Sequence, residues 1–238
     1  LQGDWISDVC SSDRLRREMD IAVVATQPPF ISLSSSIAEL PASGTRAADI
    51  TAFLRDARGE LLSTNDTTRV RFSIVQGQAT LSQSETVANS GLASTQVRSL
   101  GLAGPIVVRA EAEHLQSAEI ELQARAEAAY RLDLVVVPAT IVADRQSTAV
   151  LSAVVRDSLG NIVSDAAADI SFSIESGNAE IIGPQTAITQ NGTAQTTLRS
   201  SIRAEAITLR AEAPGLLSGS TQLQLTAGPA AKIQLRSE

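Results

Sequence analysis

The chain has 238 residues and a formal net charge of −7, and only 3% of its side chains are aromatic although 43% are apolar. This length suffices for one large domain or for two of ordinary size. The apolar runs are only a few residues long, which excludes a transmembrane helix. An acidic balance without blocks of Lys and Arg argues against a nucleic-acid partner, because clustered basic side chains dominate binding to phosphates.

The first thirteen residues differ from the rest of the chain, and we interpret them as foreign. Residues 4–13 read DWISDVCSSD, which resembles a translated sequencing adapter at every position except Ile6. The alternative is a genuine start that is rich in Ser and Asp. A secretory signal would need a basic start and an apolar stretch, and neither occurs here. We therefore expect residues 1–13 to be a disordered artefact and the sequence to be a fragment of a longer gene.

The remaining chain carries the same pattern twice. Residues 50–59 (ITAFLRDARG) match residues 151–160 (LSAVVRDSLG) at an offset of 101. Two further blocks recur at offsets of 100 and 101: Phe72–Ile74 with Phe172–Ile174, and Arg109–Ala112 with Arg210–Ala213. Because the offset grows by one residue between these two blocks, we expect a one-residue insertion in a loop of the second unit. Self-similarity at a fixed period is the signature of tandem repeats.

The repeats divide the chain into two full units and two incomplete ones. We expect the first unit at residues 29–129 and the second at residues 130–230. Residues 14–28 stand where the last strand of a preceding unit would be, and residues 231–238 repeat the start of a unit.

Each unit has the pattern of an all-β domain. Ile50, Ala52 and Leu54 alternate with more polar positions, which predicts a strand with one buried face. The stretch 118–129 has a helix-forming composition, but its counterpart Thr221–Leu225 alternates as a strand does, so we predict that both are closing strands. About seven short strands in about 100 residues are typical of an immunoglobulin-like sandwich, here without the disulfide.

The junction between the units lacks the composition of a flexible linker. From Gln123 to Leu134 the chain contains no Gly, Pro or Ser, whereas flexible linkers are rich in Gly and Ser. We therefore predict tandem immunoglobulin-like β-sandwiches joined end to end, which behave as a semi-rigid rod with contacts between neighbours.

The order of motifs resembles that of bacterial immunoglobulin-like domains of group 1, which form the stalks of intimin- and invasin-type surface adhesins. The motifs are a strand followed by Asp-x-x-Gly, then V-x-F-S-I-x-x-G-x-A, then N-G-x-A, then an Ala-rich strand. The first unit departs from the usual pattern, with Arg58-Gly59-Glu60 where Gly-Asn is commoner, and the second unit keeps Gly160-Asn161.

This resemblance implies a structural spacer that presents a distal binding domain, and a location at the cell surface, extracellular and attached to the outer membrane. Its partners would be neighbouring repeats, and a host or glycan receptor bound through domains outside this sequence. It implies no enzyme activity, no cofactor and no catalytic, cofactor-binding or metal residues. Two alternatives stay open: an accessory module of a secreted, multidomain polysaccharide-acting enzyme, and a glycan- or receptor-binding adhesin module.

The acidic residues nevertheless offer one candidate metal site. Asp56 and Asp157 each end a strand and are followed by a Gly three positions on, a pattern that favours a tight turn. The alternative is a weak Ca²⁺ site at the junction, since Ca²⁺ needs six to eight oxygen ligands. Glu127 and Asp133 near the junction are interleaved with arginines, which makes a poor cage.

Two further candidates are the single imidazole and a pair of carboxylates. His114 falls in a loop between the last two strands of the first unit, and its counterpart is Gly215, so we expect a solvated side chain without a catalytic role. Arg109, Glu111 and Glu113 are two positions apart, so on a strand their side chains would point to the same face. We expect them to form a solvent-exposed row of acidic and basic groups without a catalytic role.

The aromatic residues are too few for a sugar-binding platform, which commonly uses exposed rings. Phe72 and Phe172 occupy equivalent positions on core-facing sites of their strands. Only Phe30, Phe53 and Tyr130 are then left for a surface, so the sequence does not support carbohydrate binding.

Overall fold

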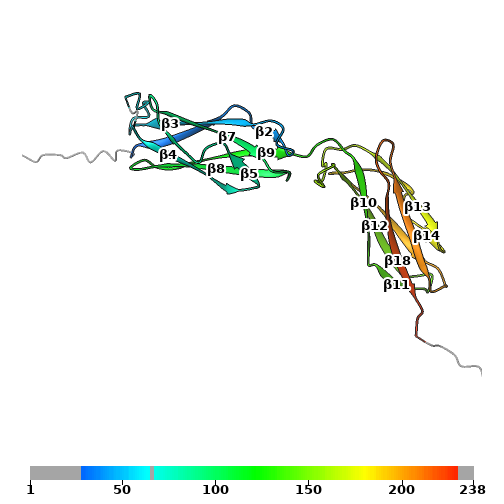
Figure 1. Ribbon diagram of the computed structural model, residues 1–238. Helices are drawn as coiled ribbons and strands as arrows, with labels where there is room; N and C mark the ends of the chain where they lie inside the picture. The colour runs from blue at the N-terminus through cyan, green and yellow to red at the C-terminus, as the bar shows by residue number, and fades with distance from the viewer. Residues whose placement is uncertain (1–27, 65–66, 230–238) are drawn as a thin grey trace, which may run out of the picture.

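The computed structural model describes residues 28–64 and 67–229 and contains two β-sandwiches that follow each other along the chain (Figure 1). All its regular elements within these residues are strands, so no described helix is long and apolar enough to cross a membrane. The fold class predicted from the sequence is thus confirmed. The expectations for residues 1–13, 14–27 and 231–238 lie outside the described residues, and the unit boundaries stay a prediction.

The first sandwich pairs a four-stranded sheet with a five-stranded sheet, in the orders β1-β3-β7-β5 and β2-β9-β8-β4-β6. Neighbouring strands are antiparallel except for the parallel pair of β2 and β9. Its strands are β1 (Phe30–Ser35), β2 (Glu39–Pro41), β3 (Ala48–Arg55), β4 (Arg69–Gln76), β5 (Ala79–Leu81), β6 (Glu85–Val87), β7 (Leu92–Ser99), β8 (Gly104–Ala112) and β9 (Ala118–Arg125).

The second sandwich repeats this plan strand for strand, with the orders β10-β12-β16-β14 and β11-β18-β17-β13-β15. Its strands are β10 (Arg131–Val137), β11 (Thr140–Val142), β12 (Thr148–Arg156), β13 (Asp169–Ser176), β14 (Ala179–Ile181), β15 (Thr186–Ile188), β16 (Thr193–Ser200), β17 (Ala206–Glu212) and β18 (Gly219–Thr226).

Each sandwich therefore has nine strands where the sequence predicted about seven. The difference has one cause, which is that two of the seven strands switch sheets. β1 lies in the four-stranded sheet, and its continuation β2 lies in the five-stranded sheet beside β9. The segment of β5 and β6 changes sheets in the same way, and a strand that turns such a corner is interrupted at the bend.

The alternation seen in the sequence places the core as predicted. Ile50, Ala52 and Leu54 are fully buried, and Phe72 and Phe172 are 1% and 4% exposed. The buried apolar residues form two separate clusters, one in each sandwich. The predicted closing strands are also found, although β9 ends at Arg125 and residues 126–129 are not part of it.

The predicted insertion is located in a loop. β5 and β14 are related by an offset of 100, whereas β6 and β15 are related by an offset of 101. The extra residue therefore lies between β14 and β15, in residues 182–185, where it lengthens a connection without disturbing either sheet.

Candidate functional site at the junction of the two sandwiches

The five residues 126–130 that connect β9 to β10 are largely absorbed into the second sandwich. Ala126 and Ala129 pack against the core of the second sandwich. The backbone N–H of Tyr130 donates to the carbonyl of Arg156 at 2.8 Å, and its own carbonyl accepts the N–H of Leu217 at 3.0 Å. The conformation of the connection is thus constrained, because its alanine side chains and the backbone of Tyr130 contact the second sandwich.

The Asp157 carboxylate is the centre of the junction. Its Oδ1 accepts the backbone N–H groups of Leu159 and Asn161 at 2.9 and 2.8 Å, which forms the turn predicted from the sequence. Its Oδ2 accepts the backbone N–H of Glu127 at 2.9 Å, so the connecting segment is held to the turn after β12. Asp157 has no exposed surface. A charge-assisted hydrogen bond away from water is stronger than a neutral one, so this contact is a firm attachment.

The Asn161 side chain joins the two sandwiches directly. Its Nδ2 donates to the carbonyl of Gly101 at 2.9 Å and to Asp157 Oδ2 at 2.9 Å. Its Oδ1 accepts the backbone N–H of Ala103 at 2.8 Å. Gly101 and Ala103 belong to the loop between β7 and β8, at the end of the first sandwich. One buried amide therefore bonds to two backbone groups of the preceding unit.

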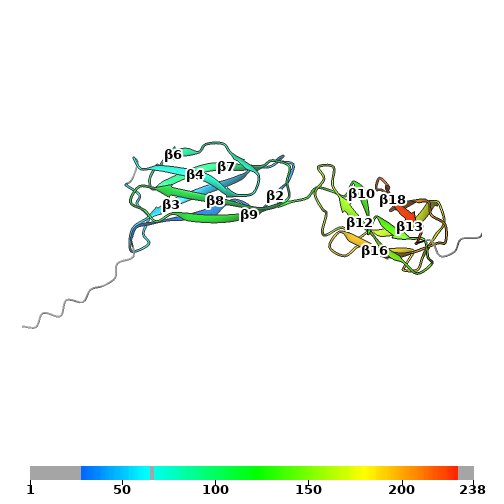
Figure 2. The ribbon, with the colours of Figure 1, turned by 90° about the horizontal axis from the view of Figure 1, so that it is seen from below.

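Glu127 also contacts both units. Its N–H reaches Asp157, while its carboxylate accepts hydrogen bonds from the backbone N–H and the hydroxyl of Ser43 in the first sandwich. Figure 1 shows the sandwiches meeting end to end with a bend at this point, and Figure 2, seen from below, shows them nearly in line. The side-chain hydrogen bonds between the two sandwiches thus lie where their ends meet.

Two opposing effects act on the pKa of Asp157. Burial raises the pKa, but the hydrogen bonds from the Asn161 side chain and from the N–H groups of Glu127, Asn161 and Leu159 outweigh it and lower the pKa. The carboxylate therefore stays ionised at neutral pH, in the form that accepts all of these bonds.

The equivalent turn of the first sandwich makes no such contact among the described residues. Asp56 Oδ1 accepts the N–H groups of Arg58 and Glu60 at 2.8 and 2.9 Å, so the turn itself is the same. Glu60 stands where the second unit has Asn161, and its side chain is exposed. Gly59 and Gly160 have φ values of +86° and +94°, which confirms that both turns need a glycine there.

The candidate Ca²⁺ ligands at the junction are not brought together. Asp133 lies against Arg131, at 3.0 Å, and against Arg156, while Glu127 bonds to Ser43. Within residues 28–64 and 67–229, no three acidic, His or Cys side chains are close enough to hold a metal ion. The acidic groups here stabilise turns and pair with arginines.

The carboxylate pair at the end of β8 differs in part from the sequence prediction. Glu111 lies on β8, 3.7 Å from Arg109, whereas Glu113 lies in the turn after the strand, so the prediction that Glu113 belongs to the row of charged groups is wrong. The reason is that β8 ends at Ala112, where the chain turns towards β9. Glu113 lies instead 3.3 Å from Nε2 of His114.

His114 is located in the predicted loop between β8 and β9, with a side chain that is 88% exposed. Its φ is +64° and that of its counterpart Gly215 is +77°, which explains why glycine occupies this position in the second unit. The turn requires this backbone conformation but no imidazole.

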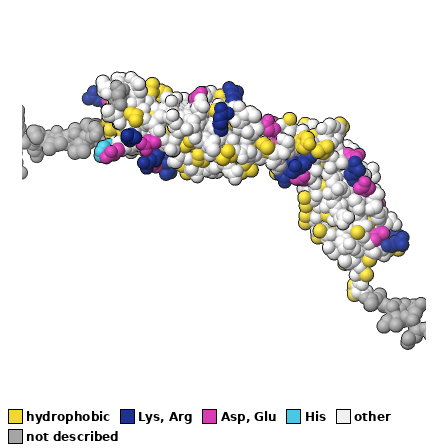
Figure 3. All heavy atoms as spheres, in the orientation of Figure 1, with side chains coloured by type: hydrophobic (Ala, Val, Ile, Leu, Met, Phe, Trp, Pro, Cys, Tyr) yellow, Lys and Arg dark blue, Asp and Glu magenta, His cyan; other side chains and the backbone are white. Residues whose placement is uncertain are grey.

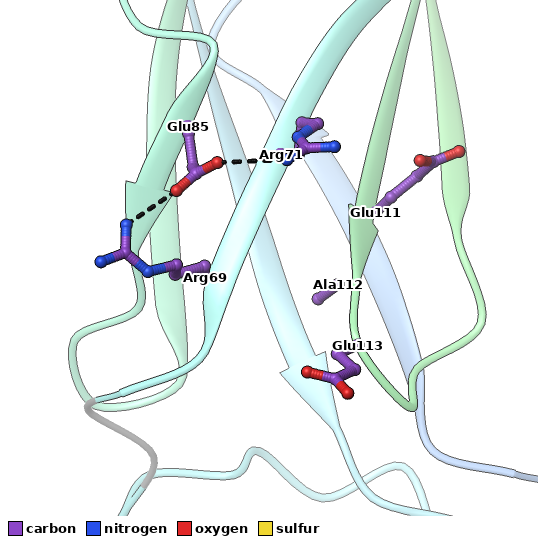
Figure 4. Close-up of a pocket in the computed structure, with 6 residues that line it drawn as sticks. All are labelled: Arg69, Arg71, Glu85, Glu111, Ala112 and Glu113. Carbon is purple, nitrogen blue, oxygen red and sulfur yellow. Dashed lines mark hydrogen bonds and ion pairs between the residues drawn. The ribbon is translucent and has the colours of Figure 1, made fainter.

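A shallow hollow on the five-stranded sheet of the first unit is lined by charged side chains (Figure 4). Arg69 on β4 pairs with Glu85 on β6 at 2.8 Å, and Arg71 approaches the other oxygen of Glu85 at 3.5 Å. These pairs are exposed, and such pairs contribute little stability. The face drawn in Figure 3 likewise intersperses basic and acidic side chains, without a large patch of one sign.

The aromatic residues do not form a platform. Phe72 and Phe172 are buried as predicted, and Tyr130 is 48% exposed beside the junction. Phe53 is half-buried, with the Arg55 guanidinium 5.6 Å from its ring centroid.

The sequence did not reveal the inter-unit role of Asn161. Its one available signal was the Gly160-Asn161 pair of the turn motif, which the first unit replaces with Gly59-Glu60. Together, the fold and the junction define a class of protein, namely tandem immunoglobulin-like sandwiches that are coupled end to end.

The comparisons with known proteins found a similarity for the second unit. Residues 131–228 match the family model described as invasin, domain 3. No curated protein matches the chain in sequence. The second unit is therefore similar to domain 3 of invasin, and the first unit repeats its strand order.

Solved structures to which the chain is similar include those of intimin, of InvD and of a β-glycosidase. The D0-D1 domain of intimin is 20% identical, over 84% of this chain and 99% of that one, with a TM-score of 0.37. InvD of Yersinia pseudotuberculosis is 18% identical, over 87% of this chain and 60% of that one, with a TM-score of 0.49. A β-glycosidase from Bacteroides vulgatus is 14% identical over 84% of this chain, which spans 25% of the enzyme, with a TM-score of 0.44. TM-scores below 0.5 leave these likenesses too weak to assign a function.

Proposed function

We propose that this chain is a structural spacer from the stalk of a bacterial surface adhesin of the intimin and invasin type. The single observation that carries this proposal is the junction, in which Asp157 and Asn161 attach the second sandwich to the end of the first. A pair that touches only at its ends and is held there spans a greater distance than a compact pair of equal mass. The sandwiches themselves resist extension through their cores and inter-strand hydrogen bonds.

In this role the chain does no chemistry and binds its own neighbouring repeats. It holds a distal binding domain away from the bacterial cell surface, and contact with a host or glycan receptor is made by parts of the protein outside this sequence. The family of the second unit supports this placement, since its model is named for invasin. The scattered, mutually paired charges of the described surface also fit a spacer better than a binding site.

Small-angle X-ray scattering on residues 29–230 tests this proposal. We expect the pair-distance distribution of an elongated particle with two maxima, one for distances within a sandwich and one for distances between them. A distribution with a single symmetric maximum, as from a compact sphere, would contradict the spacer role, because the pair would then add little reach. Isolated residues 130–230 serve as the control and should give the first maximum alone.

A further inference from the structure

The contact that couples the two sandwiches has two halves, and each half is supplied by a residue that the other unit lacks. The first half is the Gly101 carbonyl, which accepts the Asn161 amide, and Gly101 has a φ of +93°. The second half is Asn161 itself. At the equivalent positions the second unit has Ile202 in place of Gly101, and the first unit has Glu60 in place of Asn161.

We propose that Gly101 and Asn161 form a two-part lock that makes this junction stiff, and that the two outer ends of the pair join neighbouring repeats more loosely because each lacks one part. This inference rests on the proposed spacer function. It states what a stiff junction between two repeats needs: a glycine at the position of Gly101 in the preceding repeat and an asparagine at the position of Asn161 in the following one.

Glutamate at position 161 would not close the lock. A Glu carboxylate has no donor for the Gly101 carbonyl, and it would stand beside the Asp157 carboxylate, which has no exposed surface. Two like charges in a place removed from water repel each other strongly. In the first unit Glu60 avoids this conflict because its side chain is exposed to solvent.

Isoleucine at position 101 would also not close the lock. A β-branched residue strongly disfavours positive φ, and Ile202 is not among the described residues with positive φ. The loop between β16 and β17 therefore follows a different backbone path from the loop that holds Gly101. The Ile202 side chain is 64% exposed and projects at the outer end of the second unit.

The other side-chain link between the sandwiches, from Ser43 to the Glu127 carboxylate, lies at an exposed position where water competes for its hydrogen bonds. The side chain of Asp157 holds the connecting segment through the N–H of Glu127, and it is linked to the loop of Gly101 and Ala103 through Asn161. Domains in one chain move relative to each other unless the interface between them is extensive. Loss of the amide should therefore free the first sandwich to swing about residues 126–130.

Distances between spin labels at Ser94 and Gln195 test the lock in the full chain with Cys10→Ser. These positions are exposed and equivalent, on β7 and β16. We expect one narrow distance distribution for the wild-type pair. Asn161→Glu and Gly101→Ile, which each copy the residue of the other unit, should widen it about twofold or more. The matched swaps at the outer ends, Glu60→Asn and Ile202→Gly, should leave it unchanged.

The two locking swaps fall in different sandwiches, so each remains informative if the other fails to fold. Circular dichroism confirms that the sheets are intact in each variant. A narrow distribution in a folded Asn161→Glu or Gly101→Ile chain overturns the lock, and so does a broad distribution in the wild type. Neither result alters the scattering test of the spacer, since a loosely joined pair of sandwiches is still elongated.

Discussion

The turn after β3 and the turn after β12 have the same backbone but different surroundings. Both contain an Asp whose Oδ1 accepts two N–H groups within the turn, and both contain a glycine with positive φ. In the second unit the other carboxylate oxygen and the following Asn161 reach outside the turn, to Glu127 and to the first sandwich. The comparison teaches that a turn needed for folding also joins two domains when an amide follows its glycine and the preceding unit presents a loop such as that of Gly101 and Ala103.

The cores provide the first test of this comparison, because here the two units should behave alike. Phe72→Ala and Phe172→Ala should each lower the free energy of unfolding of their own unit by about 3–5 kcal/mol, since each removes a buried ring and leaves a cavity. Denaturant titrations of the isolated units measure this loss.

Tyr130→Ala is the control for the core variants, because that ring is 48% exposed and should cost much less. A loss below about 1 kcal/mol at Phe172 would contradict the core position of its ring, and a large difference between the two phenylalanines would contradict the equivalence of the units.

The two turns should differ in their contributions to stability. Asp157→Ala should destabilise the second unit by about 3 kcal/mol, because it leaves the N–H groups of Leu159, Asn161 and Glu127 without their charged acceptor. Asp56→Ala should cost the first unit only about 1 kcal/mol, because its turn is more exposed and water replaces the lost acceptor. Calorimetry of both variants measures the difference, and equal losses would show that the contacts of Asp157 beyond the turn add nothing.

Acid should weaken the second unit through Asp157. The folded pKa of this carboxyl is lowered below its unfolded value of about 4, so its contribution is complete above that pH and is lost as the pH falls through the folded pKa. Between pH 6 and pH 3 the wild-type unit should therefore lose more stability than the Asp157→Asn variant. The pKa of Asp144 is lowered to about 2 by the N–H groups of Ser147 and Gln146. Because Asp144 is present in both proteins, its contribution to the pH dependence is the same in each and drops out of the comparison. Chemical unfolding at each pH measures the free energy of unfolding. An equal loss in the wild type and in Asp157→Asn would contradict the role of Asp157 in this pH dependence.

Much of the fold could be predicted from the sequence because it depends on local pattern. The alternation around Ile50 and Ile170 specified which face of each strand is buried, and the offsets specified where the insertion falls. The end of β8 was predicted wrongly at Glu113, because alternation continues past the residue where backbone pairing stops. The switch of β1 into β2 was also missed, since a change of partner strand leaves no period in the sequence.

The sequence by itself determined that this protein contains a β-sandwich written twice and that the link between the copies is short, because side-chain period and composition are properties of neighbours along the chain. Only the tertiary structure decided that Asn161 meets Gly101, sixty positions earlier, and that Glu60 meets no equivalent partner among the described residues. The physical reason is that an amide becomes a link between domains only where folding removes it from water and places a backbone donor and acceptor from the other domain within reach.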